Sequence, residues 1–224
     1  MMRRQVHGMN LRTLMIMAAA LSLSPIGTAV ADDDDPAAAP APGWRTVATQ
    51  QDRARIRGWW ATWENAIAAA RASGHGGEIE ADAALFAPGG ALPNPHLPPG
   101  AYRCRTVKLG MRGGTDAGTA AVGGYIAYPW FACRVTAEQG LFSFAKLDGS
   151  QRPMGLIFQD NARRQIFLGT LMLGEERTPL NYGDDPHRDM AGLVERIGAT
   201  RWRIVLPQPA FESLLDVIEL VPAG

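Results

Sequence analysis

The sequence has no excess of charge of either sign. Its 22 basic residues balance 22 acidic residues, and it contains only four histidines and two cysteines. A nucleic-acid-binding domain carries a basic patch or stripe, and a disordered chain combines low hydrophobicity with high net charge. The balanced, 46% hydrophobic composition therefore argues against a nucleic-acid partner and indicates a folded globular protein.

Long hydrophobic runs are also missing, apart from a short one near the N-terminus. This run, Leu14 to Leu23, is about half as long as the roughly 20 apolar residues of a transmembrane helix. Basic residues precede it at Arg3, Arg4 and Arg12, and an A-x-A pattern ends at Ala31. We therefore predict a signal peptide over residues 1–31, cleavage after Ala31, a periplasmic mature protein and no transmembrane span after cleavage. An uncleaved anchor is the alternative.

Familiar catalytic motifs are absent as well. The sequence has no G-x-S-x-G, no H-E-x-x-H and no phosphate-binding loop. Ser143 and Lys146 match the S-x-x-K signature of serine β-lactamases, but that chemistry needs both residues on one face of a helix. The segment alternates like a strand, where residues three apart point to opposite faces. We expect no cofactor and favour a non-enzymatic protein.

Two regions follow the predicted signal peptide. Residues 32–43 read DDDDPAAAPAPG, a composition with nothing to bury, so we predict a disordered linker. Residues 44–224 are enough to bury a substantial core, and we predict a single domain over this range.

The domain is predicted to begin with an amphipathic helix. Thr49 is its expected N-cap, Asp52 completes a weak capping box, and Ser73-Gly74 ends it. Its apolar residues recur at helical spacing: Ile56, Trp59, Trp60, Trp63, Ile67 and Ala70. We expect this stripe to pack on the rest of the domain. A short second helix is predicted near 78–86, and the connection 87–99 holds five prolines.

Strand-like segments with turn signals between them fill the rest of the chain. We predict strands near 101–109, 125–135, 140–147, 153–158, 164–173, 191–197, 201–206 and 213–221. Sequential antiparallel strands favour a closed, roughly eight-stranded β-barrel with the helix packed on it, an α+β fold; a sandwich is the alternative. Residues 186–197 also fit an amphipathic helix capped by Asp185, and this alternative stays open.

The two cysteines and several polar residues are candidate functional positions. In an oxidising compartment the pair Cys104 and Cys133 predicts a disulfide. The turn after the third predicted strand suggests a polar binding rim formed by Lys146, Asp148, Gln151 and Arg152. A weaker candidate for a hard cation is the group Asp184, Asp185, His187 and Asp189. Three arginines flank the cysteines and suggest a basic stripe on the sheet: Arg103, Arg105 and Arg134.

Four runs resemble a family of exported alphaproteobacterial proteins known only as domain of unknown function 4893. These runs are GAYRCRTVKLG (100–110), YPWFAC (128–133), FSFAKLDGSQRP (142–153) and ESLLDVIELVP (212–222). The resemblance implies export and a single domain, and it brings no catalytic residue.

A shorter motif, Gly100-Ala101-Tyr102, resembles the opening strand of lipocalin-type (calycin) barrels, with tyrosine in place of tryptophan. That likeness implies a basic residue over the Tyr102 ring, and Arg201 or Arg203 is the expected one. The tyrosine–cysteine opening is also similar to that of small periplasmic lysozyme inhibitors.

Together these features lead to three functional hypotheses. The first is a non-enzymatic periplasmic protein, envelope-associated or binding a small apolar ligand, and the second is a lysozyme-inhibitor-like protein that binds an envelope protein. A barrel interior filled by Phe142, Phe144, Phe158, Phe167 and Trp202 would argue against carriage of a ligand and for a surface role. The third is a hydrolase of envelope material, which would need Asp148 to converge with Glu195 or Asp216 in a cleft.

Overall fold

A computed structural model describes residues 42–111 and 124–224. The chain divides into two units, Met1–Ala38 and Ala39–Gly224, and every described residue belongs to the second unit. The predicted signal peptide and almost all of the predicted linker lie outside the described residues.

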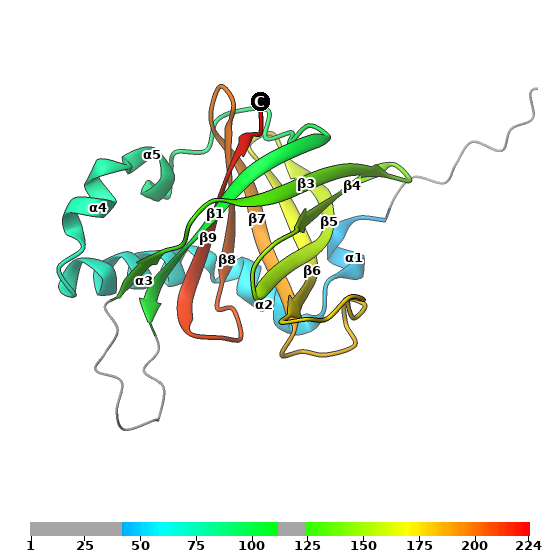
Figure 1. The fold of residues 1–224 in the computed structure, drawn as a ribbon, viewed down its shortest axis with the longest axis horizontal. Helices are drawn as coiled ribbons and strands as arrows, with labels where there is room; N and C mark the ends of the chain where they lie inside the picture. The colour runs from blue at the N-terminus through cyan, green and yellow to red at the C-terminus, as the bar shows by residue number, and fades with distance from the viewer. Residues whose placement is uncertain (1–41, 112–123) are drawn as a thin grey trace, which may run out of the picture. The chain divides into compact units, whose positions relative to one another are not determined.

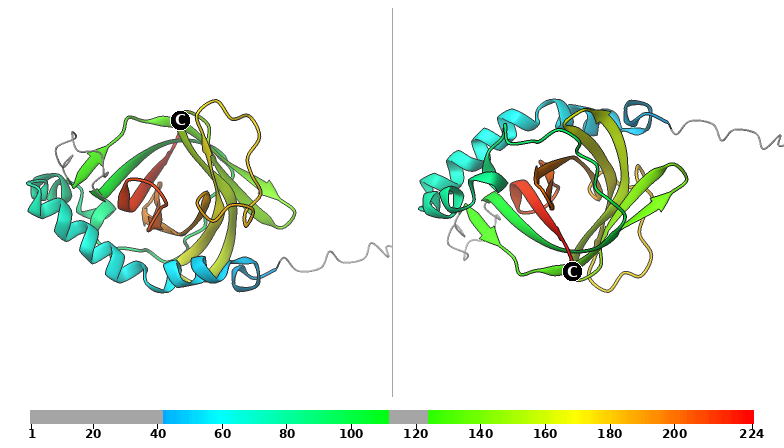
Figure 2. Two further views of the ribbon diagram at one scale, coloured as in Figure 1. Left: turned by 90° about the horizontal axis from the view of Figure 1, so that it is seen from below. Right: turned by 90° about the horizontal axis from the view of Figure 1, so that it is seen from above.

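A closed antiparallel β-barrel is the main element of the second unit (Figures 1 and 2). The strands are β1 (Gly100–Met111), β2 (Tyr125–Ala127), β3 (Phe131–Glu138), β4 (Leu141–Lys146), β5 (Gln151–Asn161), β6 (Arg164–Leu173), β7 (Asp189–Gly198), β8 (Arg201–Pro207) and β9 (Ser213–Pro222). Strands β3 to β9 pair in chain order, and β1 joins β3 to β9, which closes an eight-stranded barrel. The fold is therefore a barrel, as predicted, and the sandwich alternative is wrong.

The predicted strand 125–135 is two strands, β2 and β3, which both pair with β1. Val107 of β1 lies opposite Ala127 of β2, and Cys104 lies opposite Phe131 of β3. Pro129 stands between the two strands and has no backbone N–H to continue the ladder. The interruption leaves Tyr128 and Trp130 partly exposed to solvent.

Residues 189–198 form strand β7, which decides between strand and helix for the ambiguous segment. The helix-start signal at Asp185 produces only one turn. Its carbonyl oxygen accepts from the backbone N–H groups of Arg188 and Asp189, and its side chain accepts from the N–H of His187. Pairing with β6 and β8 on both sides then holds residues 189–198 as a strand.

The helices lie before the barrel strands in the sequence: α1 (Trp44–Val47), α2 (Gln50–Arg57), α3 (Trp59–Ala72), α4 (Gly76–Ala81) and α5 (Ala83–Phe86). Thr49 caps α2 through its hydroxyl, which accepts from the backbone N–H of Asp52. The predicted single helix is interrupted at Gly58, which separates α2 from α3. No helix in the described part of the chain is long and apolar enough to cross a membrane.

Two hydrophobic clusters form the core, one inside the barrel and one between its outer wall and the helices. Trp59 and Trp63 are buried in the outer cluster, as the apolar stripe predicts. Trp60 was expected there too, but it is 44% exposed. At 100° per residue it points a quarter-turn away from Trp59, so it lies outside the contact with the barrel.

The proline-rich segment 87–99 lies across the end of the barrel where β1 begins (Figure 2). Leu97 is fully buried in the interior cluster. The carbonyl oxygens of His96 and Pro98 accept hydrogen bonds from the side chains of Trp202 and Tyr102, at 3.0 and 2.7 Å. The segment is therefore an ordered plug, since its backbone oxygens are paired with interior side chains.

Candidate functional site

Aromatic rings fill the interior of the barrel. Phe144 and Phe167 pack edge to face with ring centroids 6.0 Å apart, and Tyr102 and Trp202 do so at 6.2 Å. Phe142 is partly buried against the same cluster, whereas Phe158 belongs to the outer cluster. Four of the five rings named as possible interior fillers lie there and Phe158 does not, so the described residues do not support carriage of a ligand inside the barrel.

The basic residues expected over Tyr102 lie on the opposite face of the barrel wall. Tyr102 is inside the barrel, while Arg201 donates to Asp82 and Arg203 lies over the ring of Trp63, both on the outer wall. Odd and even positions of β8 face opposite sides, so Trp202 takes the place beside Tyr102. The lipocalin-like arginine contact is absent from the described residues.

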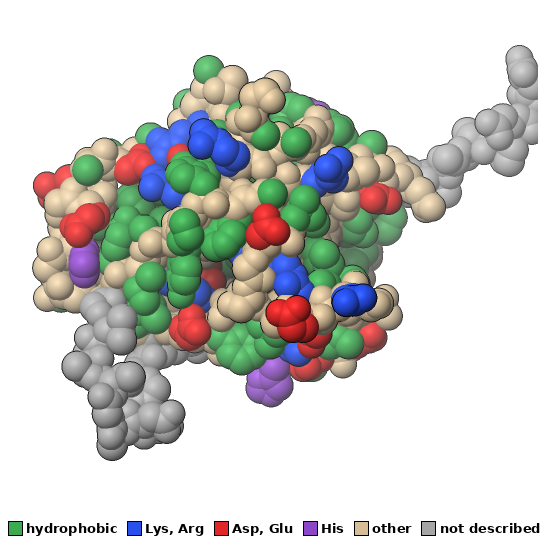
Figure 3. All heavy atoms as spheres, viewed as in Figure 1, with side chains coloured by type: hydrophobic (Ala, Val, Ile, Leu, Met, Phe, Trp, Pro, Cys, Tyr) green, Lys and Arg blue, Asp and Glu red, His purple; other side chains and the backbone are tan. Residues whose placement is uncertain are grey.

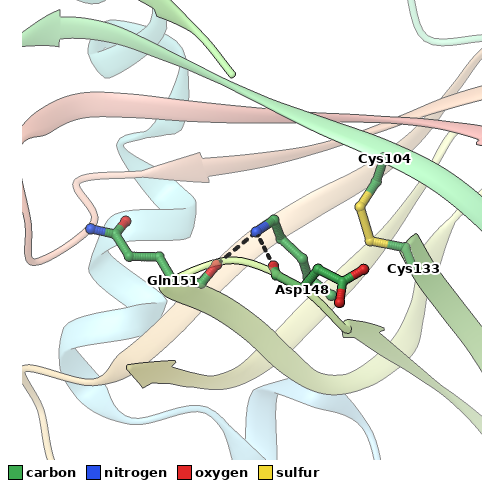
Figure 4. The surroundings of a disulfide bond; sticks show 5 residues. Cys104, Cys133, Asp148 and Gln151 are labelled. Atoms are coloured by element: carbon green, nitrogen blue, oxygen red, sulfur yellow. Dashed lines mark hydrogen bonds between the residues drawn. A yellow bond between two sulfur atoms is a disulfide. The ribbon is translucent and has the colours of Figure 1, made fainter. Parts of the chain in front are cut away.

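Only part of the predicted polar rim comes together. Lys146 is buried, and its ammonium donates to the backbone oxygens of Asp148 and Gln151, the two contacts dashed in Figure 4. Its Nζ also lies 3.8 Å from the centroid of the Phe131 ring. The Asp148 residue is exposed, and Arg152 donates to the carbonyl oxygens of Gly149, Gly174 and Glu176. Lys146 and Arg152 therefore stabilise turns rather than form a shared rim.

A small polar pocket of about 120 Å³ lies at this end of the barrel, next to Lys146 and Lys108. Lys108 contacts the carboxylates of Glu212 and Asp216, each at 3.2 Å. Burial disfavours the charged ammonium, but the two carboxylates outweigh it and raise the pKa of Lys108. Both lysines are already bonded to protein oxygens, so neither is free to bind an anion in this pocket.

The weak metal candidates do not converge. The carboxylate of Asp184 accepts from Asn181, that of Asp185 accepts from the N–H of His187, and that of Asp189 accepts from the N–H of Gly183. No group of three or more potential metal-binding side chains occurs among the described residues. These acids therefore serve the turns before β7.

Each of the acids proposed for a hydrolase lies in different surroundings. Asp148 is exposed in the β4–β5 turn, Glu195 is paired with Arg203 under α5, and Asp216 is bonded to Lys108. The S-x-x-K match fails as well, because Ser143 bonds to Glu138 while Lys146 is buried at the barrel end. Neither arrangement assembles a nucleophile with a base.

The structure instead forms an apolar groove of about 530 Å³ between α3 and the α4–α5 pair. Its floor is made by Trp63, Ile79 and Phe86, which are almost fully buried. Two small exposed residues, Ala68 of α3 and Ala83 of α5, line it as well. A mostly apolar concavity of this size is typical of small-molecule sites.

Buried charges fix the walls of this groove to the barrel. Arg203 and Glu195 are both fully buried and lie 2.7 Å apart, and Arg203 also donates to the carbonyl oxygen of Leu85 in α5. The Arg203 guanidinium lies over the Trp63 ring, 4.6 Å from its centroid. Asp82, between α4 and α5, bonds to Arg201 of β8. These contacts hold the groove in one shape.

Sequence reasoning did not find the groove. The sequence predicts a packed apolar stripe that includes Trp63 and Ile67, and Ile79 lies in the predicted second helix. Nothing in the spacing of these residues distinguishes the wall of a groove from a core. The only signal was the small size of Ala68 and Ala83 beside large apolar neighbours. Small residues there leave space only once α4 and α5 turn back on α3, which is a tertiary property.

The predicted disulfide is present and lies beside the polar end of the barrel (Figure 4). Cys104 of β1 and Cys133 of β3 are bonded, 29 positions apart, with Cα atoms separated by 5.9 Å. Both are buried in the interior cluster. The bond joins two neighbouring strands of the barrel wall.

A comparison with protein families places the helices and the barrel in one family domain. The model of a family described as "Domain of unknown function (DUF4893)" matches residues 44–220. The chain belongs to the DUF4893 family. The matched region begins at α1 and ends within β9, so the family domain consists of the helices and the barrel together. No curated protein and no solved structure matches the chain.

Proposed function

We propose that the protein is exported and is a non-enzymatic binding protein for a small apolar molecule, held in the groove between α3 and α4–α5. The observation that carries the proposal is the apolar groove of about 530 Å³. It lies outside the barrel, so a ligand can enter it without disturbing the packed interior.

The polar groups of the described residues favour binding over catalysis. Lys108 is held by two carboxylates and Lys146 by two carbonyl oxygens. Glu64, Arg71 and Glu80 lie at the groove, and none of them is buried. They suit orientation of a ligand better than proton transfer in a water-excluded site.

The inhibitor alternative has less support. Tyr102 and Cys104, which carry the likeness to lysozyme inhibitors, are buried inside the barrel and offer no surface to a protein partner. Export rests on the sequence of residues 1–31, and a disulfide in the barrel agrees with an oxidising compartment.

The groove can be tested with the neutral apolar dye N-phenylnaphthylamine, whose fluorescence rises in an apolar site. We expect the wild-type protein to bind the dye and Ala68→Trp, which fills the groove, to bind roughly tenfold or more weakly. Asn65→Trp is the control, because it adds the same ring at an exposed position of α3 that does not line the groove. Ala83→Trp provides a second filled groove from the opposite wall.

Native mass spectrometry of protein purified from its own host then identifies a retained molecule. A small apolar ligand that is present in wild type and lost in Ala68→Trp supports the proposal. Dye binding that is equal in wild type and both filled variants would show that the groove is not the binding site.

A further inference from the structure

A second groove, of about 320 Å³, lies on the outer wall of the barrel across β1 and β3. Small side chains leave the space: Ala101, Ala132 and Ala223 line it, together with Trp130 and Leu147. Trp130 and Leu147 are 38% and 44% exposed. The groove is thus partly apolar and open to solvent.

Two arginines give this groove a positive charge. Arg103 lies opposite Ala132, and Arg134 lies opposite Ala101, so the two side chains occupy the same outer face, diagonally across β1 and β3. Neither has a carboxylate partner among the described residues. Arg105, the third arginine of the predicted basic stripe, is neutralised by Glu219 and Asp82. Figure 3 shows Lys and Arg atoms gathered beside hydrophobic atoms on this face of the molecule.

Two of these three arginines also hold the aromatic wall of the groove in place. The guanidinium carbons of Arg103 and Arg105 lie 5.3 and 5.1 Å from the centroid of the Trp130 ring. The disulfide between Cys104 and Cys133 joins the two strands that carry the walls. A ligand would therefore meet a preorganised surface, which lowers the entropic cost of binding.

We propose that this groove binds a small organic anion with a flat or apolar body. Its carboxylate, sulfonate or phosphate pairs with Arg103 and Arg134, and its body lies against Trp130 and Leu147. Guanidinium groups bind such anions through paired, charge-assisted hydrogen bonds, and they also stack on aromatic rings. The site is separate from the helical groove and does not depend on the function proposed for it.

The test compares two probes of nearly equal shape by calorimetry with the full mature chain. We expect naphthaleneacetate to bind roughly tenfold more tightly than neutral naphthaleneethanol, because only the acid pairs with the arginines. Arg103→Gln/Arg134→Gln removes this preference. Arg57→Gln/Arg177→Gln is the control, since it removes the same charge from exposed positions outside the groove and should leave the preference unchanged.

The helical groove is tested separately with Ala68→Trp, which should bind naphthaleneacetate as wild type does. The proposal is overturned if the acid and the alcohol bind equally, or if Arg103→Gln/Arg134→Gln keeps the preference for the acid. Loss of the preference in Ala68→Trp would overturn it as well, because the anion would then occupy the other groove.

A final arm distinguishes a free acid from a lipid headgroup. If the wild type sediments with phosphatidylglycerol vesicles and Arg103→Gln/Arg134→Gln does not, the anion is carried by a lipid. If the wild type stays in solution while it binds naphthaleneacetate, the anion is a free small acid.

Discussion

Two buried lysines lie at the same end of the barrel in different electrostatic surroundings. Lys108 contacts two carboxylates, so its charge is compensated. Lys146 instead donates to two carbonyl oxygens and lies against the Phe131 ring. Neutral oxygens compensate a buried charge less than a carboxylate does, and burial lowers the pKa of Lys146 to about 8.

This low pKa predicts a pH-dependent stability. Between pH 8 and the ordinary lysine value of 10.5, the unfolded chain holds a proton on Lys146 that the folded protein has lost. The free energy of unfolding therefore gains from Lys146 as pH rises through this window, by at most about 1.4 kcal/mol per pH unit. Urea unfolding at several pH values should show this gain in wild type and not in Lys146→Met. Equal slopes for the two proteins would contradict it.

The Arg203–Glu195 pair predicts a strong and non-additive effect on stability. Both side chains are fully buried, so Arg203→Met leaves the Glu195 charge with only the longer contact to Arg164, at 3.5 Å. Removing one member of a buried pair costs roughly 3–5 kcal/mol, whereas replacing both can be nearly neutral. We expect Arg203→Met/Glu195→Leu to be more stable than Arg203→Met in chemical denaturation. A double variant whose loss equals the sum of the two single losses would argue against coupling.

At the scale of elements, local patterns predicted most strands. They missed the places where long-range contacts determine where a strand or helix begins or ends. Strand-like residue content and the turn signals on either side were enough to predict β6 and β9 close to their true bounds, although both strands are buried along almost their whole length. The break between β2 and β3 had a local signal, Pro129, but both strands pair with β1, and only the tertiary pairing shows where each one ends. Gly58 separates α2 from α3 although the apolar spacing continues through it.

The proline-rich segment 87–99 is expected to contribute to the free energy of unfolding, although its sequence is typical of a loop. Leu97 is fully buried in the interior cluster, whereas Leu92 in the same segment is 37% exposed. Leu97→Ala should lower the free energy of unfolding by roughly 2–5 kcal/mol, since it leaves a cavity in a packed core. Leu92→Ala should change it by less than about 0.5 kcal/mol. Similar effects of both changes in thermal unfolding would mean that the segment is not a plug.

At the scale of the whole molecule, closure of the barrel limits where a ligand can bind. A closed eight-strand barrel has an interior just wide enough for side chains, and here aromatic rings fill it. This packing favours the outer wall, or the space between the wall and the helices, as the place for an apolar ligand. Both proposed grooves are there, and both depend on contacts between segments distant in the sequence, such as α3 with α5 or β3 with Ala223.

Export predicts a defined mature N-terminus. If residues 1–31 are a signal peptide, the intact mass of the protein from the periplasm corresponds to a chain that begins at Asp32. Ala29→Arg/Ala31→Arg should leave the precursor uncleaved, because the cleavage site needs small residues at these positions. Ala37→Arg, in the predicted linker, is the control and should be processed normally. Full-length protein recovered from the cytoplasm would contradict export.

The disulfide connects the proposed export to the stability of the barrel. Cys104 and Cys133 close a loop over 29 positions, and a bond of that span stabilises a fold by roughly 3–4 kcal/mol in the chain-entropy model. Cys104→Ala/Cys133→Ala should therefore lose about that much in denaturant, and a thiol reductant should destabilise wild type but not the variant. Thiol titration of the unfolded, unreduced protein should find no free thiol. Two free thiols in protein from the periplasm would mean that β1 and β3 are held together by strand pairing alone, without the covalent link that preorganises the wall of the second groove.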